Sequence, residues 1–322
     1  MSGKRITIRE VAAAASVTAQ TVSRVYGGKG YVSAETRKRV LDAAKELNYI
    51  PNHTAAALRK GDSKIIAVVF DSLCNIYFSI MVDYIHREVQ KRGYTLQTIF
   101  VDSHIITENI YRHALSLGAS AVISFLETDP ALDKAITIFN SPLIIFGRRA
   151  LSDHIDYITT DDVQGGRLVA NRLIEGGCKT FLYASEAFDM TCVKDRFLGF
   201  EEVLSKHGYS SDIIDCSGGA EKKLTEYIQS GKLPDGIFCL SDMIGYGVLK
   251  ALKKLDISDV KVIGYDDIQS DITLPVNLTS VGLNKYEYVV YVLTKIIDKI
   301  EGRLTGRIAE KVPVTLYVGE TG

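Results

Sequence analysis

The sequence has no tryptophan, and its five cysteines are an odd number set far apart. No cysteine pair shows the short spacing of a zinc or redox site, so we expect reduced thiols and no bound metal. No apolar run approaches the roughly 18 residues that a membrane-spanning helix needs, and no charged-then-apolar leader opens the chain. These absences predict a soluble, cytoplasmic protein without a membrane partner. The cysteines are Cys74, Cys178, Cys192, Cys216 and Cys239.

Common catalytic motifs are also missing. The sequence contains no Walker A phosphate loop, no His-Glu-x-x-His zinc motif and no Gly-x-Ser-x-Gly turn of the hydrolase type. An enzyme is therefore the least favoured class of protein, and we expect neither catalytic residues nor a cofactor.

Charge is nearly balanced over the 322 residues but unevenly distributed. Residues 1–63 carry 11 lysines and arginines and 5 aspartates and glutamates, a net charge of +6. Residues 64–322 carry 27 and 34 of them, a net charge of −7. A basic first segment on an acidic body is expected when only that segment touches nucleic-acid phosphates. The length leaves room for two or three domains with buried cores.

The basic segment begins with the pattern of two short helices. Thr7-Ile8-Arg9-Glu10 has the spacing of a capping box, and apolar residues follow on a helical period as far as Ala15. After a break at Ser16-Val17, Thr18 is a good N-cap for a second helix that ends near Val25. Helix, tight turn and helix form the arrangement that places a second helix in the DNA major groove.

The second helix offers different side chains on different faces. Val22 and Val25 lie three apart and can pack inward, whereas Gln20 and Arg24 lie four apart and can reach the same groove. Gln pairs well with adenine and Arg with guanine, so both suit base edges. The alternative is a solvated surface helix that happens to carry one Gln and one Arg.

A third helix and a possible fourth complete this segment. Ser33 can cap a helix over residues 34–47, and Pro51 stops it because proline disfavours helix in the residue before it. Pro51 can itself begin a short helix over residues 52–59, which contains the isolated apolar residue Leu58.

From residue 64 the pattern changes to short apolar strands that alternate with amphipathic helices. Fully apolar runs such as residues 65–70 suit parallel strands covered on both faces. The alternation restarts after residue 160, which predicts two successive doubly wound lobes. The predicted strands are 65–70, 94–100, 121–125, 143–146, 181–184, 237–240 and 260–265, and the helices are 78–92, 106–117, 164–175, 193–207, 245–254 and 286–302.

The whole chain resembles the LacI/GalR family of bacterial transcription regulators. The resemblance rests on ITIREVAAAASVTAQTVSRV and VSAETRKRVLDAAKELNYIPN in the first segment, and in the body on TDDVQGG at 160–166, RFLGF at 196–200, PDGIF at 234–238, GYDDI at 264–268 and LTSV at 278–281. It implies a small all-α helix-turn-helix headpiece followed by two doubly wound α/β lobes of periplasmic-binding-protein type. The implied domains are a headpiece at 1–50, a hinge helix and linker at 51–63 and an effector-binding body at 64–322, with an N-lobe near 64–160, a C-lobe near 161–290 and a crossover near the C-terminus.

The resemblance also implies which residues touch DNA. In the family the hinge helices of two subunits pair on DNA, and a hinge leucine, matched here by Leu58, wedges into the minor groove. The alternative for Leu58 is a linker residue that packs on its own domain. The expected DNA-binding residues are Thr7, Thr18, Ala19, Gln20, Thr21, Ser23, Arg24, Asn52, His53, Leu58 and Arg59.

A second site is expected between the lobes, because ligands of open α/β sheets bind beyond the carboxyl ends of the strands. Arg196 and Asp266 match effector-contacting positions of the family, and Asp242 directly follows a predicted strand. Alternatively, Arg196 pairs with a nearby carboxylate and Asp242 caps the helix that begins at Met243. The expected effector-binding residues are Arg196, Asp266, Asp242, Ser241, Tyr77 and Arg148.

The pocket departs from the family pattern at several positions. Ser241 stands where an Asn is common, Gly147 stands where an Asp is common, and a stacking aromatic has to come from Tyr77 or Phe188. The sequence therefore does not decide whether the ligand is a sugar, a phosphorylated sugar, a nucleobase or another small metabolite. A sugar or sugar derivative is the leading candidate.

These observations predict a repressor that binds a palindromic operator as a homodimer and is controlled by a small effector. The sequence has no heptad tail of the kind that holds a tetramer, so a dimer is favoured. The alternative is a solute-binding protein of the same body fold without a DNA function, which the headpiece pattern argues against.

Overall fold

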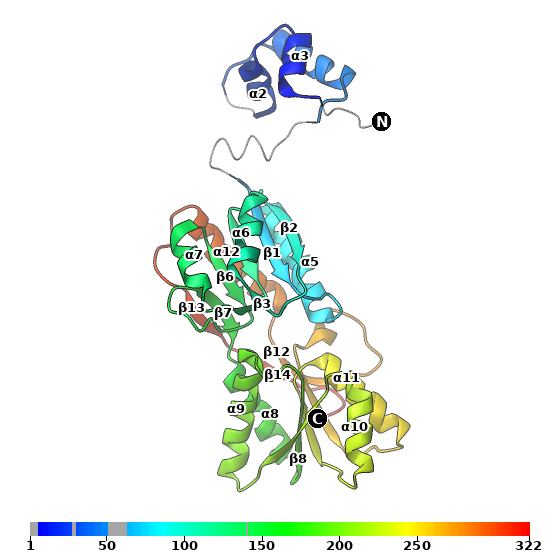
Figure 1. Ribbon diagram of the computed structural model, residues 1–322. Coiled ribbons are helices and arrows are strands. Elements are labelled where there is room, and N and C mark those ends of the chain that lie inside the picture. Colours follow the sequence, from blue (N-terminus) through cyan, green and yellow to red (C-terminus); the bar gives the residue numbers. More distant parts are fainter. Residues whose placement is uncertain (1–5, 28–29, 51–62, 140) are drawn as a thin grey trace. The chain divides into compact units, whose positions relative to one another are not determined.

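A computed structural model describes residues 6–27, 30–50, 63–139 and 141–322 (Figure 1). The chain divides into two compact units, residues 1–63 and residues 64–322. The five cysteines are free thiols, and Cys178, Cys216 and Cys239 are buried. Among the described residues, no helix is long and apolar enough to cross a membrane.

The first unit is a bundle of short helices: α1 (Ile8–Ala14), α2 (Ala19–Gly27) and α3 (Ala34–Glu46). The predicted capping box begins α1, because the Thr7 side chain and the Glu10 side chain each bond the other residue's backbone amide. The predicted caps of the other helices also form, since Thr18 Oγ1 accepts from the Thr21 amide and Ser33 Oγ accepts from the Thr36 amide. The predicted hinge helix at 52–59 lies outside the described residues.

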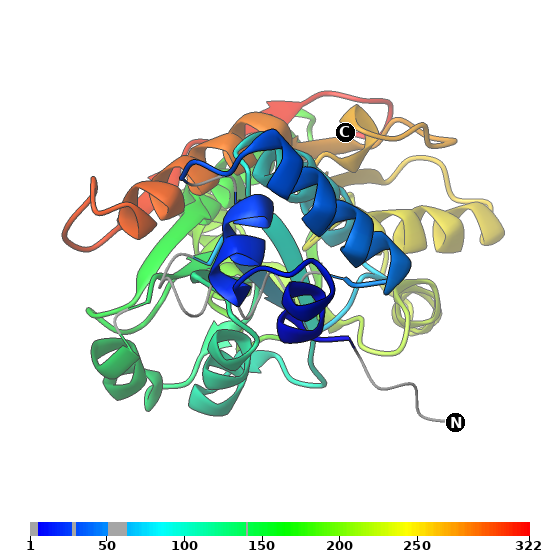
Figure 2. The ribbon, with the colours of Figure 1, turned by 90° about the horizontal axis from the view of Figure 1, so that it is seen from above.

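The second unit begins with the N-lobe, a parallel sheet in the order β13-β7-β6-β4-β1-β2. Alternate strand residues face two separate cores. Ile66, Val68 and Phe70 pack against helices α5 and α12, and Ala67 and Val69 pack against α6 and α7. Figure 2 shows the orange α12 on one side of this sheet and the green α7 on the other. The strands are β1 (Ile65–Phe70), β2 (Thr95–Phe100), β4 (Ala121–Ser124), β6 (Leu143–Phe146), β7 (Asp156–Thr160) and β13 (Ala309–Val312), the helices are α5 (Ile76–Lys91), α6 (Glu108–Ser116), α7 (Leu132–Phe139) and α12 (Lys285–Ile300), and a small sheet pairs β3 (Ile105–Ile106) with β5 (Glu127–Thr128).

The C-lobe repeats this plan with a sheet in the order β14-β12-β11-β10-β8-β9, in which β14 alone among these described strands is antiparallel. Helices α8 and α9 cover one side of the sheet and α10 and α11 the other (Figure 1). The strands are β8 (Phe181–Ser185), β9 (Ser211–Asp215), β10 (Gly236–Cys239), β11 (Lys261–Tyr265), β12 (Thr279–Gly282) and β14 (Thr315–Tyr317), and the helices are α8 (Asp162–Glu175), α9 (Thr191–Lys206), α10 (Ala220–Gln229), α11 (Asp242–Lys254) and the 3₁₀ turn η1 (Ile268–Ser270).

The chain passes between the lobes after β7, after β12 and between β13 and β14. Helix α12 belongs to the N-lobe, because Tyr288, Val292 and Ile296 pack into the N-lobe core. The first C-lobe segment therefore ends at β12 rather than near residue 290. The predicted fold class, an all-α headpiece followed by two doubly wound α/β lobes, is confirmed.

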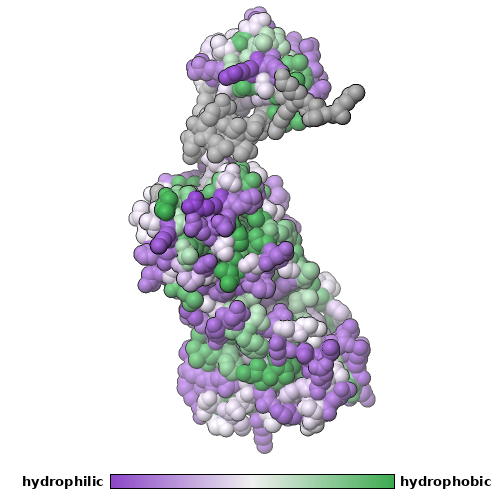
Figure 3. Space-filling model, viewed as in Figure 1, coloured by the Kyte–Doolittle hydropathy of each residue, from purple (hydrophilic) through white to green (hydrophobic). Residues whose placement is uncertain are grey.

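On the face of the body that Figure 3 shows, hydrophilic residues surround the exposed hydrophobic ones in both lobes. This mixture is the ordinary surface of a protein whose cores are already covered.

Two glycines bring helices α8 and α9 unusually close together. A Cβ atom at Gly166 would overlap the Arg196 carbonyl oxygen, and one at Gly199 would overlap the Val163 carbonyl oxygen. Both positions are helical, so glycine is needed here for the close approach of two backbones. The close contact holds the start of α8 beside the Arg196 side chain of α9.

Candidate functional site

The second helix of the headpiece separates its polar and apolar side chains as the sequence predicts. Val22 and Val25 are buried in the headpiece core, and Gln20 and Arg24 are exposed. Arg37 of α3 donates a hydrogen bond from Nη1 to the Val25 carbonyl oxygen (3.2 Å), which ties the last turn of α2 to the core. Two long polar side chains are thus held on the open face of a short, anchored helix.

The other predicted DNA-binding residues divide into three groups. Thr7, Thr18 and Ser23 are exposed, although Thr7 and Thr18 also cap the starts of α1 and α2, and Ala19 and Thr21 are half-buried on α2. The predicted hinge residues lie outside the described residues; they are Asn52, His53, Leu58 and Arg59.

A cavity of about 720 Å³ lies between the two lobes of the body. Five of the six predicted effector-binding residues line it, namely Tyr77 and Arg148 from the N-lobe and Arg196, Ser241 and Asp266 from the C-lobe. Four of them stand just after strands or at the starts of the helices that follow, and Arg196 lies in the second turn of α9. The cavity therefore lies at the edge of both sheets where the rule for open α/β sheets predicts a ligand.

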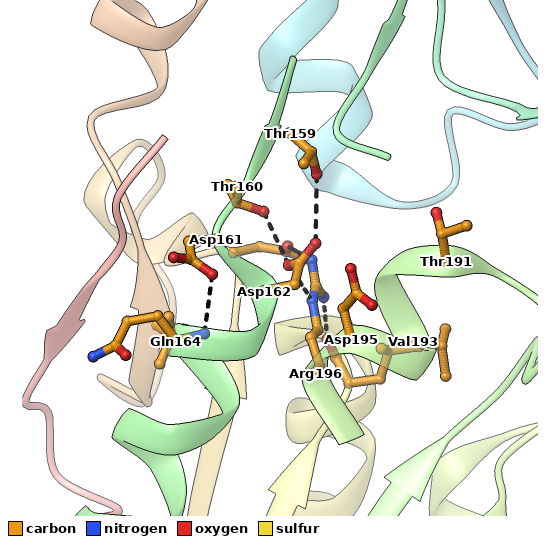
Figure 4. Close-up of polar contacts among 12 residues, drawn as sticks. Thr159, Thr160, Asp161, Asp162, Gln164, Thr191, Val193, Asp195 and Arg196 are labelled. Carbon is orange, nitrogen blue, oxygen red and sulfur yellow. Dashed lines mark hydrogen bonds and ion pairs between the residues drawn. The ribbon is translucent and has the colours of Figure 1, made fainter. Parts of the chain in front are cut away.

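Arg196 is the best-anchored polar group of this cavity. Its Nε donates to Asp162 Oδ1 (2.9 Å), its Nη1 donates to the Leu240 carbonyl oxygen (2.6 Å), and its guanidinium carbon lies 3.5 Å from the centre of the Tyr265 ring. Asp162 is itself held by the hydroxyl of Thr160 (2.9 Å), as Figure 4 shows. Arg196 thus both pairs with a carboxylate and lines the cavity. Its pairing with a carboxylate, given above as the alternative to an effector contact, therefore does not exclude that contact.

Asp266 brings a carboxylate to the cavity at an energetic cost. Its side chain is 9% exposed, and its nearest described cation is Arg196, whose Nη2 lies 3.9 Å from Oδ1. Burial raises the pKa of Asp266 to about 7, although Arg196 and Lys285 oppose the shift. Its backbone φ of 104° lies in the left-handed region, which a residue with a side chain rarely adopts. Backbone strain and a poorly compensated carboxylate at one position are typical of functional sites.

Asp242 was expected to be an effector-binding residue, but it is not among the residues that line the cavity. It is fully buried, and its carboxylate accepts hydrogen bonds from the Ile268 amide (2.8 Å) and the Ser280 hydroxyl (2.6 Å). The cap of α11 is Ser241, whose hydroxyl accepts from the Ile244 amide. Asp242 therefore ties α11 to β12 and to the turn after β11, and it positions Asp266 indirectly.

The N-lobe side of the cavity is largely aromatic. Tyr77, Phe78, Phe125 and Phe146 line it, and their rings follow one another at centroid distances of 5.7, 5.3 and 5.1 Å. Phe188, the other sequence candidate for stacking, is exposed and is not among the lining residues. Phe125 and Phe146 are not among the expected effector-binding residues, although each ends a predicted strand and the same edge rule points to it.

Several polar contacts between the lobes cannot be predicted from the sequence. The Glu127 carboxylate of the N-lobe accepts from the amide (2.8 Å) and the hydroxyl (3.0 Å) of Thr191 in the C-lobe. Arg149 forms a bidentate pair with Asp195, with donor–acceptor distances of 2.5 and 2.8 Å. No motif marks these residues, because they come from opposite lobes and meet only in the folded chain.

The geometry defines a class of protein: a two-lobed ligand-binding body joined in one chain to a helix-turn-helix headpiece. Residues 7–52 match the family of bacterial regulatory proteins called the lacI family, and residues 170–321 match a periplasmic binding protein-like domain. The sucrose operon repressor of Streptococcus mutans is 30% identical over 80% of this chain and 82% of its own. The ribose operon repressor of Halalkalibacterium halodurans is 29% identical over 98% of this chain and 96% of its own.

A solved structure agrees with these relatives on the fold. The lac repressor dimer bound to operator and the anti-inducer ONPF matches with a TM-score of 0.83 at 22% identity, and the match covers 99% of each chain. The protein belongs to the LacI family of bacterial transcriptional regulators. It is a DNA-binding regulator controlled by a ligand, and its relatives are repressors rather than enzymes.

Proposed function

We propose that this protein is a homodimeric repressor that binds a palindromic operator with two headpieces. A sugar or sugar derivative bound between the lobes sets its affinity for that operator. The observation that carries the proposal is one cavity that combines an aromatic wall with the anchored charges of Arg196 and Asp266. Aromatic faces stack on the apolar face of a sugar ring, while fixed carboxylate and guanidinium groups bind its hydroxyls. The relatives named as ribose and sucrose operon repressors favour the same class of ligand.

In this proposal the headpiece reads bases with the exposed side chains of α2. Gln20 and Arg24 contact base edges in the major groove, and Thr7, Thr18, Ala19, Thr21 and Ser23 contact the surrounding groove and backbone. Leu58 wedges into the minor groove, with Asn52, His53 and Arg59 beside it. The two-fold symmetry of the dimer then requires a two-fold symmetric operator. A regulator with this role acts in the cytoplasm, on the nucleoid.

Regulation follows from the three passages of the chain between the lobes. A ligand that contacts both lobes favours one relative orientation of them, and the dimer transmits that orientation to the spacing of its hinge helices. The competing function, a solute-binding protein that ignores DNA, leaves the exposed Gln20 and Arg24 of the headpiece without a role.

The test selects bound duplexes from a random pool and then measures the affinity of the selected site by fluorescence anisotropy at fixed salt. We expect a palindromic site bound by a dimer, and a change in Kd of about tenfold or more when one sugar of a panel of pentoses, hexoses and disaccharides is added. A full-length protein without DNA affinity at low salt contradicts the proposal.

A further inference from the structure

The positive side chains that line the cleft are already neutralised by the protein itself. Arg196 pairs with Asp162 at 2.9 Å, Lys285 pairs with Asp271 at 2.7 Å, and Arg148 lies 3.6 Å from Glu127. The partner carboxylates are buried or nearly so, with side-chain exposures of 2%, 12% and 13% respectively. These pairs are weakly screened by water, so the three cations have little charge left to offer a ligand.

The described residues that line the cleft also include carboxylates with no such matching cation. Asp266 lies no nearer than 3.9 Å to Arg196, which is already paired with Asp162. Glu186 and Asp189 also line the cavity, whereas Asp71, another lining residue, bonds His104. After the internal pairing, the carboxylates of Glu186 and Asp189 therefore make the remaining charge of the cleft negative, and Asp266 adds to it above its pKa of about 7.

Helix N-termini commonly bind anions, and three of them beside the cleft are occupied as well. The side chain of Asn75 caps α5 (3.0 Å to the Tyr77 amide), that of Asp161 caps α8 (3.2 Å to the Gln164 amide), and that of Ser241 caps α11 (3.4 Å to the Ile244 amide). Each of these acceptors comes from the helix's own N-cap residue.

Helices α9 and α10 have no cap of this kind, and Ser217 and Gly218, which precede α10, line the cavity. Helix α9 differs from α10 in that a residue of the other lobe takes its first amide. Its N-cap residue, Met190, has no side chain that can cap, and the acceptor at the Thr191 amide is Glu127 from the other lobe. One Glu127 oxygen, Oε1, takes the Thr191 amide and hydroxyl and is also the atom that lies 3.6 Å from Arg148. A helix N-terminus, a hydroxyl and an arginine are together the donors that a phosphate group uses. Glu127 thus takes up donors that an anion would use, and of these the Arg148 guanidinium lines the cavity.

We propose that these internal carboxylates make the cleft selective for uncharged ligands and exclude anionic ones such as sugar phosphates, with Glu127 as a specificity-determining residue. The proposal rests on the proposed function, in which the cleft holds the effector. An anionic ligand has to give up its hydration and meets a cavity whose remaining charge is negative, whereas a neutral polyol donates hydroxyl hydrogen bonds to the carboxylates that line the cavity, such as Asp266. Replacing Glu127 by the neutral, isosteric glutamine keeps an acceptor for Thr191 and frees the charge of Arg148.

The experiment measures binding of D-ribose 5-phosphate and of inorganic phosphate to the full-length protein by isothermal titration calorimetry at constant ionic strength. We expect the wild-type protein to bind both at least about tenfold more weakly than Glu127→Gln does. Glu226→Gln, an exposed carboxylate on α10, is the matched control and stays like wild type. Asp271→Asn frees Lys285 in the same way and serves as a second variant if Glu127→Gln does not fold.

Two results overturn the inference: a wild-type protein that binds ribose 5-phosphate more tightly than D-ribose, or folded Glu127→Gln and Asp271→Asn proteins without any gain in phosphate affinity. The failure of the proposed function is separate from these results. If no neutral or anionic sugar changes the operator Kd, regulation from the cleft fails, whereas a phosphorylated sugar that changes it in the wild-type protein contradicts only the charge selectivity.

Discussion

The buried carboxylate of Asp266 is predicted to lower the stability of the folded protein at neutral and higher pH, and the effect can be measured without knowing the ligand. Its pKa is about 7 in the folded protein, against 3.8 for an ordinary aspartate. Because the folded-state pKa is raised, the folded protein holds the proton more tightly than the unfolded chain does. The contribution to stability is therefore full below pH 3.8 and is lost as the pH rises to about 7. The total loss at pH 8 is roughly 4 kcal/mol, of which roughly 2 to 3 kcal/mol falls between pH 5 and pH 8.

The informative substitution is Asp266→Asn, which keeps the shape of the side chain and removes its charge. Asparagine tolerates the left-handed backbone at least as well as aspartate, so the φ of 104° adds no new strain. We expect the variant to be more stable than wild type at pH 8 by up to roughly 4 kcal/mol and to lose its response to the effector. Urea unfolding followed by far-UV circular dichroism at pH 5 and pH 8, at constant ionic strength, measures the difference.

Asp256→Asn is the matched control, because Asp256 also has a left-handed backbone (φ 55°) but is exposed. This control is expected to follow the pH dependence of the wild-type protein. The unfolding free energy of Asp266→Asn could instead fall in parallel with that of wild type between pH 5 and pH 8. That result would show that ionisation of Asp266 does not destabilise the folded protein, and it would refute the reasoning.

Three further predictions concern packing and DNA. Gly199→Ala should lower the free energy of unfolding by about 1–3 kcal/mol, because its Cβ overlaps the Val163 carbonyl oxygen and forces α8 and α9 apart. Chemical denaturation checks this, and an equal loss in Leu198→Ala, a change at an exposed residue of the same helix, would count against it. Arg24→Ala and Gln20→Ala should change which operator sequences are preferred, by about 1–3 kcal/mol at one base pair, whereas Lys45→Ala on α3 should leave the preference unchanged. Binding to operator libraries tests this prediction, and an unchanged preference in all three variants contradicts the groove assignment. Leu58→Ala, outside the described residues, should lower both operator affinity and operator bending in a circular-permutation assay, and unchanged bending would contradict the wedge.

The sequence predicted those parts of the fold that depend on local patterns. The apolar run at 65–70 became β1 with the predicted bounds, and the caps at Thr7, Thr18 and Ser33 formed because capping depends on residues three apart. The predicted strands leave out β9 and β13, among others. The sequences of these two, SDIID and AEKV, show no apolar run because both strands lie at sheet edges. Their pairing depends on neighbours that are distant in the chain.

The candidate site divides in the same way. The cavity-lining positions of Arg196 and Asp266 agree with the sequence-based expectation, because each stands in a motif that the family resemblance supplies, and their role as effector contacts stays a prediction. The role of Asp242 could not be predicted, because the choice between facing a cavity and bonding Ser280 is made by the turn after β11. The Glu127–Thr191 and Arg149–Asp195 contacts depend on how the two lobes meet, which no short stretch of sequence encodes.

The central claim is that the cleft and the headpiece are coupled, and reciprocal binding tests it most directly. The operator Kd is measured by anisotropy with and without the sugar found in the screen, and the sugar Kd is measured by calorimetry with and without operator. Thermodynamic linkage requires both Kd values to change by the same factor, which we expect to be about tenfold or more. Operator affinity that is identical with an empty and a saturated cleft would contradict the account.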